Sequence, residues 1–247
     1  MIKKMLVNVS HAEESRVAIV EDGILQELGI EVSGRGQVKG NIYKGVVTNV
    51  EPGLQAAFVD YGGKRSGFLP LSDVQLQHDA NGGMGGKREK GSSHTPLRRH
   101  QELVVQVVKD EVGSKGVALT TYISLPGRYL VLMPGSDSKG ISRKIEEESE
   151  RNKLRKIMEQ VEPPAGMGFI VRTAGYNRTK SELSRDLSYL LKLWENISLL
   201  AQQLPAPSMV YQEQDLVIRT IRDYFSIDIQ EVLIDHKEVC RRAKEFF

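Results

Sequence analysis

Three aromatic residues and four cations gather within a turn-rich part of the chain. The aromatic residues are Tyr43, Phe58 and Phe68, and the cations are Lys44, Lys64, Arg65 and Lys115. Aromatic rings on strands can stack on nucleic-acid bases, and lysine or arginine beside them neutralises phosphate. The same rings could instead fill the core of a small barrel. We interpret the rings as candidate stacking platforms for an oligonucleotide and the cations as candidate phosphate partners.

Short strands joined by glycine-containing turns are expected to position these residues. The β-forming runs are residues 43–50, 54–61, 67–71, 102–109 and 116–123. Five such strands fit a partly open Greek-key barrel, the OB fold, whose open face binds oligonucleotides. Residues 77–100 lie within this barrel and have a glycine-rich, basic composition, which predicts a mobile surface loop.

The segments on either side of the barrel mix strands and helices. Residues 3–32 predict an antiparallel meander with a hairpin turn at Asp22-Gly23, followed by a linker at residues 33–36. Thr179 and Glu182 have the spacing of a capping box at the start of a helix that ends at Pro205. The other expected strands are 128–133, 168–173 and 231–235, and the other expected helices are 146–161, 216–225 and 237–247.

Composition limits the function classes. The chain has 247 residues and a net charge of +2, so any binding to nucleic acid depends on local patches of charge. The single cysteine, Cys240, excludes a disulfide scaffold and a cysteine zinc cluster, and suits a reducing compartment. With no signal peptide and no long apolar stretch in this sequence, we expect a cytoplasmic protein without a membrane span.

A hydrolytic or metal site has no clear sequence signature. Metal-assisted hydrolysis of a phosphodiester needs clustered carboxylates, whereas the aspartates here are scattered over turns and strand ends. The five histidines lack metal-ligand spacing, and neither a phosphate-binding loop nor a dinucleotide motif is found. We therefore expect no catalytic residue and no metal or cofactor site in this chain.

Taken together, the motifs along the whole chain resemble those of the ribonuclease E/G family of bacterial endoribonucleases. They are KKMLVNV, GNIYKG, AAFVDYG, GFLP, SKGVALTT, RYLVLMPG, ISRKIE, GFIVRTAG, RDYF and EVLID. Three segments, ILQELGIE, VQVVKD and LPGRYLVLMPG, are more similar to the ribonuclease G branch of the family. Each motif alone is weak, but their combination is specific.

The resemblance implies an α+β architecture with four parts. Residues 1–37 and 209–247 correspond to two halves of an RNase H-like α/β subdomain. An S1 domain, which has the OB fold, spans residues 38–121 and is inserted into that subdomain. Residues 122–208 correspond to the family's α/β 5′-sensor region. This arrangement explains why a complete barrel separates the meander from the later helices.

The resemblance also implies two sets of contacts with single-stranded RNA. The RNA-contacting positions of the S1 domain carry over to Phe58, Phe68 and Lys115. The 5′-monophosphate contacts carry over to Arg172 and Thr173, with Gly127 and Val131 shaping the pocket. Arg143, in ISRKIE, is an additional candidate near the sensor. Tyr43 and Lys44 are RNA-binding candidates from composition alone. Without the resemblance, Arg172 reads as an ordinary surface arginine at a strand end.

The family's nuclease activity belongs to a downstream DNase I-like domain with magnesium-binding aspartates, followed by a zinc-binding cysteine pair that joins protomers. None of these positions, nor the family's oligomerisation elements, lies in this sequence. We therefore expect the RNA-binding and 5′-monophosphate-sensing part of such an endoribonuclease, which takes part in rRNA processing and mRNA decay. The alternatives are a free-standing S1-domain RNA-binding regulatory protein and a structural adaptor that recruits a partner through Phe246 and Phe247.

Overall fold

The computed structural model describes residues 2–11, 13–32, 38–75, 97–113, 115–225 and 228–246. The chain forms two compact units, of which the first combines residues 1–37 and 214–247 and the second comprises residues 38–213. The expected linker at 33–36 and most of the expected basic loop at 77–100 lie outside the described residues. So do Phe247 and the side chain of Phe246, on which the adaptor alternative depends.

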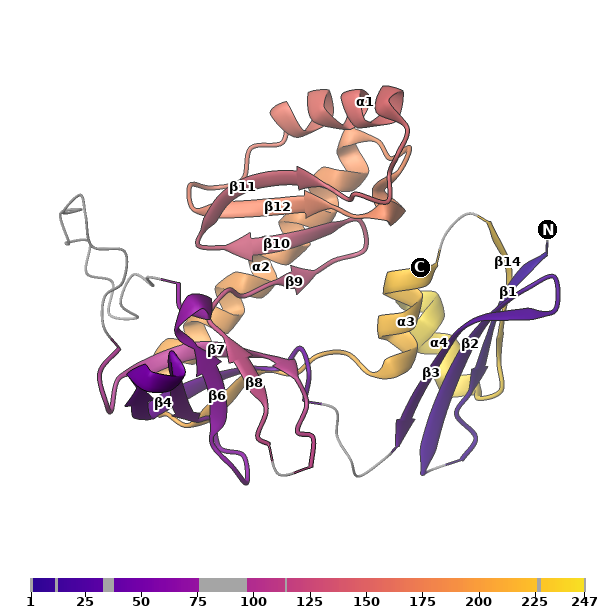
Figure 1. The fold of residues 1–247 in the computed structure, drawn as a ribbon. Coiled ribbons are helices and arrows are strands. Elements are labelled where there is room, and N and C mark those ends of the chain that lie inside the picture. The colour runs from indigo at the N-terminus through magenta and orange to yellow at the C-terminus, as the bar shows by residue number, and fades with distance from the viewer. Residues whose placement is uncertain are drawn as a thin grey trace. The chain divides into compact units, whose positions relative to one another are not determined.

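The first unit is built on a mixed sheet of four described strands. β1 (Lys3–Asn8), β2 (Glu14–Glu21) and β3 (Ile24–Val32) form the expected antiparallel meander, and β14 (Ile229–Ile234) pairs with β1 in parallel (Figure 1). Asp22 and Gly23 join β2 to β3 with positive φ angles of 48° and 83°, as a tight two-residue hairpin turn requires. The hairpin predicted from the sequence is therefore present.

Two helices cover one face of this sheet. α3 (Leu216–Tyr224) and α4 (Lys237–Phe246) enclose a core whose buried members are Met5, Val7, Val17, Ile19, Leu216, Val217, Ile221, Ile229 and Ala243. The opposite face carries apolar side chains in register, since Leu6 pairs with Leu233 on one side and with Ala18 on the other, and Ala18 pairs with Leu28. The sheet is thus apolar on both faces.

Asp235 joins the ends of β1 and β14. Its carboxylate accepts hydrogen bonds from the Val9 amide (2.8 Å), the Ser10 hydroxyl (2.7 Å) and the Asn8 side-chain amide (2.6 Å). Desolvation raises the pKa of Asp235, but these hydrogen bonds together outweigh it and leave the pKa below its ordinary value of 3.8. The ionised carboxylate therefore stabilises the pairing of strands from opposite ends of the chain.

We expect Asp235→Asn to lower the stability of the first unit by about 1 kcal/mol at pH 7, since the carboxylate is exposed to water. A depressed pKa contributes stability above pH 3.8 that is lost as pH falls through the folded-state pKa. The parent and the variant should therefore differ at neutral pH and converge as the pH falls below the folded-state pKa, which lies under 3.8. Hydrogen exchange of β1 and β14 amides checks this; equal protection at neutral pH would contradict it.

The second unit begins with a closed barrel of five strands. They are β4 (Ile42–Glu51), β5 (Ala56–Asp60), β6 (Gly67–Pro70), β7 (Glu102–Lys109) and β8 (Ala118–Thr120). β4 pairs with both β5 and β7, β6 pairs in parallel with β8, and β8 returns to β7, which closes the barrel. Short 3₁₀ turns at Pro52–Leu54 and Leu71–Asp73 follow β4 and β6. This confirms the OB fold expected from the sequence.

The barrel interior admits no side chain at Gly67. A Cβ atom there would lie 2.4 Å from Leu119 Cδ1 and 2.8 Å from its Cγ, inside the packed core. The interior is otherwise filled by aliphatic residues and two tyrosines, namely Tyr43, Val47, Ala57, Val59, Tyr61, Leu69, Leu103, Val105, Val107, Val117 and Leu119. Glycine at this position allows β6 and β8 to approach closely beside Phe68.

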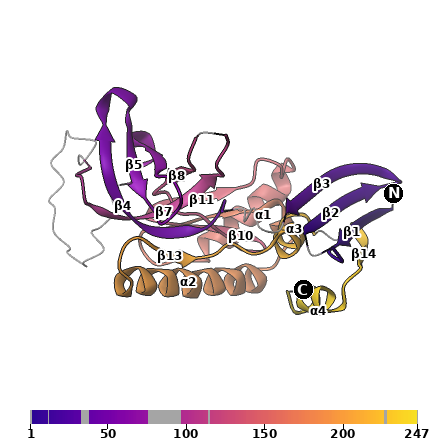
Figure 2. The ribbon, with the colours of Figure 1, turned by 90° about the horizontal axis from the view of Figure 1, so that it is seen from below.

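A second sheet and two helices complete this unit. The described strands lie in the order β11 (Ser136–Ile141), β12 (Met167–Val171), β10 (Leu130–Pro134) and β9 (Leu125–Pro126). α1 (Glu148–Glu159) contacts β11, and α2 (Lys180–Gln203) packs against β10, β9 and β13 (Ser208–Tyr211) (Figures 1 and 2). Thr179 and Glu182 form the predicted capping box at the start of α2. None of the described helices is long and apolar enough to cross a membrane.

Candidate RNA-binding face and phosphate pocket

Phe58 and Phe68 form a pair on the outer surface of the barrel. They are directly opposite each other on β5 and β6, with ring centroids 6.0 Å apart in an edge-to-face arrangement. Their strand neighbours Ala57, Val59 and Leu69 point into the barrel core, so alternation along the strands directs both phenylalanines outward. Each ring is half-buried and retains an accessible surface on which a base could stack.

Exposed cations lie beside this pair. Lys115 precedes β8 by three residues, and β8 pairs with β6 at Ala118 and Phe68. Arg65 Nη1 donates to the Gly113 carbonyl at 2.9 Å, which ties the loop before β6 to the segment that carries Lys115. Lys64, Arg65 and Lys115 are all exposed. The structure thus places these three cations on neighbouring segments at one end of the aromatic pair.

Two of the residues expected on this face lie elsewhere, which corrects the sequence interpretation. The Tyr43 ring is buried in the barrel core against Tyr61, with centroids 5.1 Å apart, so it is not available for stacking. Lys44 is buried too; its Nζ lies 2.9 Å from a Glu102 carboxylate oxygen and donates to the Leu204 carbonyl at 3.0 Å. The reason is that β4 is covered on both faces, since Ile42 belongs to the core of the second sheet and Tyr43 to that of the barrel.

Arg172 lies at the end of β12 and is held by the loop that joins β9 to β10. Its Nη1 donates to the Gly127 carbonyl at 2.7 Å, and its backbone amide donates to the Tyr129 carbonyl at 2.7 Å. Val131 faces Ile170 across β10 and β12. Alternation along β12 places Ile170 and Arg172 on the face opposite Phe169 and Val171, which are buried in the core. Arg172, Gly127 and Val131 therefore lie together.

Thr173 begins the 3₁₀ turn Thr173–Gly175 and is exposed next to Arg172. Its Oγ1 lies 3.1 Å from Ser142 Oγ, so the turn meets the loop that follows β11. Arg151 of α1 donates to the carbonyls of Ser142 and Ile145, both at 3.1 Å, and fixes this loop. The exposed side chains of Arg143 and Lys144 are thereby carried on a loop with defined ends.

A further contact joins the same two segments. The Tyr176 hydroxyl, just beyond the turn, donates to Glu147 Oε2 at 2.9 Å, and this hydrogen bond raises the pKa of Tyr176. The pKa of Glu147 is lowered by hydrogen bonds from Ser149 and then from Tyr176. The turn and the loop are thus linked at two points, through the Thr173 hydroxyl and through Tyr176.

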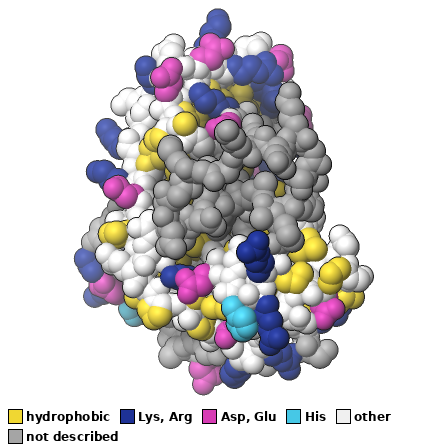
Figure 3. Space-filling model, turned by 90° about the vertical axis from the view of Figure 1, so that its left-hand side faces the viewer, with side chains coloured by type: hydrophobic (Ala, Val, Ile, Leu, Met, Phe, Trp, Pro, Cys, Tyr) yellow, Lys and Arg dark blue, Asp and Glu magenta, His cyan; other side chains and the backbone are white. Residues whose placement is uncertain are grey.

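The candidate phosphate pocket consists of Gly127, Val131, Arg172, Thr173 and the loop at Ser142. Its geometry suits a terminal phosphate. A guanidinium has five N–H donors in a rigid plane, and here one of them is anchored on a backbone carbonyl, which fixes the plane. Thr173 and Ser142 add hydroxyl groups, and Arg143 and Lys144 add exposed positive charge. On nearby α1, Arg151 and Arg155 pair with Glu148, and Figure 3 shows mixed charges at the top of the view, where α1 lies. The charges on α1 are thus mixed, whereas Arg143 and Lys144 beside Ser142 are exposed and positive.

Asp186 supports the pocket, although the sequence patterns did not indicate it. Its carboxylate, on α2, accepts hydrogen bonds from the backbone amides of Arg128 (3.1 Å), Tyr129 (2.9 Å) and Leu130 (2.8 Å). The guanidinium groups of Arg128 and Arg178 lie 5.2 and 5.0 Å from the centre of the Tyr129 ring. The contacts of Asp186 and of Arg178 with this loop join residues about 50 to 60 positions apart, so no local sequence pattern could have revealed them.

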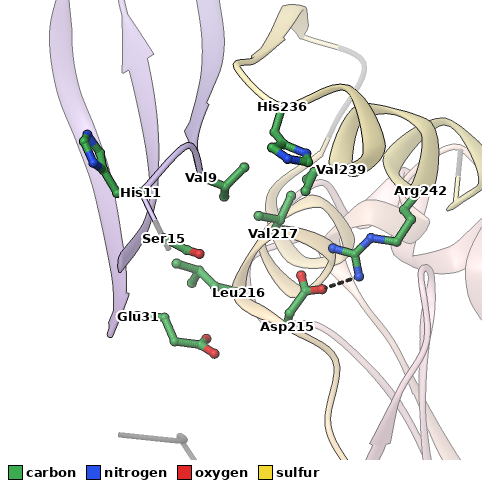
Figure 4. Close-up of a pocket in the computed structure, with 10 residues that line it drawn as sticks. All are labelled: Val9, His11, Ser15, Glu31, Asp215, Leu216, Val217, His236, Val239 and Arg242. Carbon is green, nitrogen blue, oxygen red and sulfur yellow. Dashed lines mark ion pairs between the residues drawn. The ribbon is translucent and has the colours of Figure 1, made fainter. Parts of the chain in front are cut away.

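The first unit contains a pocket of its own, with a volume of about 270 Å³ (Figure 4). It is lined in part by Asp215, Leu216, His236 and Arg242, and all its lining residues belong to the first unit, whereas the residues predicted to contact RNA belong to the second. Asp215 caps α3 by accepting from the Ile218 amide at 3.1 Å and pairs with Arg242 at 2.9 Å. Two of the pocket's polar groups, Asp215 and Arg242, thus contribute to the structure of the unit itself. Among the residues that the structure describes, no group of three or more histidine, cysteine, aspartate or glutamate side chains is placed to hold a metal ion.

Two known protein families match successive segments of the chain. The S1 RNA binding domain matches residues 37–121, and the Ribonuclease E/G family matches residues 124–247. Ribonuclease E of Escherichia coli strain K12 is 46% identical over 246 residues, which cover 99% of this chain and 23% of that protein. Ribonuclease E of Haemophilus influenzae is also 46% identical, over 99% of this chain and 26% of that protein.

Ribonuclease G of Escherichia coli strain K12 is 40% identical over the whole chain, which covers 50% of that protein. The chain thus spans between about a quarter and a half of the length of these relatives. Relatives of both the ribonuclease E and the ribonuclease G branch therefore match, with the higher identity to ribonuclease E of Escherichia coli. The chain carries an S1 RNA-binding domain and belongs to the ribonuclease E/G family.

Proposed function

We propose that this chain is the part of a ribonuclease E/G-type endoribonuclease that binds single-stranded RNA and senses its 5′-monophosphate. The barrel surface around Phe58 and Phe68 would hold the strand, and Arg172 and Thr173, with Gly127 and Val131, would hold the terminal phosphate. These residues would bind the RNA and would take no part in its cleavage. The whole protein would act in rRNA processing and mRNA decay in the cytoplasm. There, Cys240 of this chain would remain reduced.

The observation that carries the proposal is the anchored position of Arg172. Its guanidinium is held by the Gly127 carbonyl beside the exposed Thr173 hydroxyl, which the Ser142 hydroxyl contacts. A planar guanidinium fixed in this way offers charge-assisted hydrogen bonds to an oxyanion in a defined direction. A monophosphate at the end of a strand has oxygens available for such bonds, whereas a 5′-hydroxyl offers none of this charge.

The test is to compare two short single-stranded RNAs that differ only in a 5′-monophosphate or a 5′-hydroxyl. Fluorescence anisotropy at fixed salt would give both dissociation constants, because phosphate contacts make affinity depend on salt. Tighter binding of the monophosphorylated RNA is the expected result. Equal affinity would overturn the sensing part and favour an S1 RNA-binding module without 5′-end preference, and failure to bind either RNA would overturn the whole proposal.

A further inference from the structure

One carboxylate holds the loop that anchors Arg172. Asp186 Oδ1 accepts from the Arg128 amide, and Asp186 Oδ2 accepts from both the Tyr129 and Leu130 amides. Three consecutive backbone N–H groups thus converge on a single side chain, at distances of 2.8 to 3.1 Å. Hydrogen bonds to an ionised acceptor are stronger than those between neutral groups, so this carboxylate determines the course of the loop.

The same loop supplies two of the acceptors that Arg172 uses. The Gly127 carbonyl accepts from the guanidinium, and the Tyr129 carbonyl accepts from the Arg172 amide, each at 2.7 Å. The Gly127 amide in turn donates to the Leu130 carbonyl at 2.8 Å, which closes the loop. A shift of this loop would therefore move the anchor of the guanidinium.

Asp186 itself is held in a rigid position. It lies on α2, which begins with the capping box of Thr179 and Glu182 and buries Leu183 and Leu187 on either side of it. Gly127 packs closely on the carboxylate, since a Cβ atom there would lie 2.7 Å from Asp186 Oδ2 and 2.8 Å from Oδ1. The absence of a side chain at residue 127 is what allows the loop to approach the acid.

We propose that Asp186 is a positioning residue of the phosphate pocket, which orients Arg172 through the loop at residues 127–130 and does not itself contact the phosphate. This inference rests on the proposed function of the pocket. A negative charge so near an anion site would oppose binding if it were unpaired. Here its oxygens are occupied by three N–H groups, so it organises the site.

The test is Asp186→Asn, which keeps the shape of the side chain but leaves one acceptor oxygen and turns an N–H group toward a backbone N–H. We expect the ratio of affinities for 5′-monophosphate and 5′-hydroxyl RNA to fall by about tenfold, since one charge-assisted hydrogen bond is worth about that factor. Affinity for the 5′-hydroxyl RNA should not change. The matched control is Asp137→Asn, because Asp137 also accepts a backbone hydrogen bond, from Gly166 at 2.9 Å, but outside this loop.

A double variant separates positioning from a general loss of structure. If Asp186 acts only through Arg172, then adding Asp186→Asn to Arg172→Ala should change the affinity for neither RNA, whereas a general loss of structure would weaken the binding of both. An unchanged ratio in the single variant, where the parent does discriminate, would overturn the inference and leave the proposed function intact. No discrimination by the parent would instead refute the proposed function and the inference with it.

A second variant covers the case in which Asp186→Asn does not fold. Asp186→Glu keeps the negative charge but lengthens the side chain by one methylene, and the close packing of Gly127 against Asp186 leaves no room for the longer acid in the same place. We expect this variant also to lose preference for the monophosphate while it binds 5′-hydroxyl RNA like the parent. Undiminished preference in a folded Asp186→Glu protein would count against the inference.

Discussion

Replacement of both Phe58 and Phe68 by alanine should weaken binding of single-stranded RNA by at least about 1–3 kcal/mol, the contribution of one stacked base. The two rings share one outward surface with centroids 6.0 Å apart, so a base that stacks on one ring also lies near the other. The two single variants should therefore not be additive. Fluorescence anisotropy with a 5′-hydroxyl RNA measures this effect without any contribution from the phosphate pocket.

The matched control for the aromatic pair is Tyr43→Phe, which keeps an aromatic ring in the same barrel. Because Tyr43 is buried against Tyr61 and uses its hydroxyl to accept from the Asn41 side chain at 3.1 Å, this change should leave RNA affinity unaltered. Weaker binding by Tyr43→Phe than by the double phenylalanine variant would place the RNA on another surface. Circular dichroism would verify that each variant retains the barrel.

Replacement of Arg172 by alanine should abolish the preference for a 5′-monophosphate. The guanidinium supplies the charge-assisted hydrogen bonds, and their loss should cost about 10- to 100-fold in affinity for the monophosphorylated RNA. Binding of the 5′-hydroxyl RNA should remain within about twofold of the parent, since the aromatic pair lies on the barrel. Competition between the two RNAs on one sample gives the ratio directly.

Arg155→Ala is the corresponding control, since it removes the same charge from α1. Arg155 Nη1 donates to Glu148 Oε1 at 2.7 Å and to the Asn152 side-chain oxygen, and both of these partners lie on α1. This variant should discriminate between the two RNAs as the parent does. Equal loss in both arginine variants would mean that the preference reflects overall charge, and the assignment of Arg172 would fail.

Much of this architecture could be predicted because local chemistry determines it. The Asp22-Gly23 turn, the capping box at Thr179 and the end of α2 before Pro205 depend on residues that are neighbours in sequence. β11 and β13 were not predicted: β11 has few apolar residues, and β13 is short and lies in a proline-rich stretch. Their pairing with β12 and β4 depends on tertiary structure, which the sequence pattern does not contain.

The sequence predicted only some residues of the candidate site, for a similar reason. Phe58 and Phe68 stand out in the sequence because each lies beside a small residue in a basic setting, and the structure shows both rings half-buried and opposite each other. The positions of Tyr43 and Lys44 could not be predicted, because β4 is covered on both sides and the usual alternation of a barrel strand is lost. Asp186 was missed because its role consists of contacts with backbone amides, and backbone amides are identical at every position of a sequence.

The parallel pairing of β1 with β14 has a consequence for synthesis of the protein. β1 leaves the ribosome first, yet its partner strand and the helix α3 that covers it come more than 200 residues later. At about 5–20 residues per second, the apolar sides of β1 and β2 wait roughly 10–40 seconds for α3, while the inserted unit can already fold. We expect chains that are released after ending just before Leu216 to resist protease within the strands and helices from β4 to β13 but to be cut within β1–β3. Early protection of β1 would show that the nascent meander is covered by something other than its own helices.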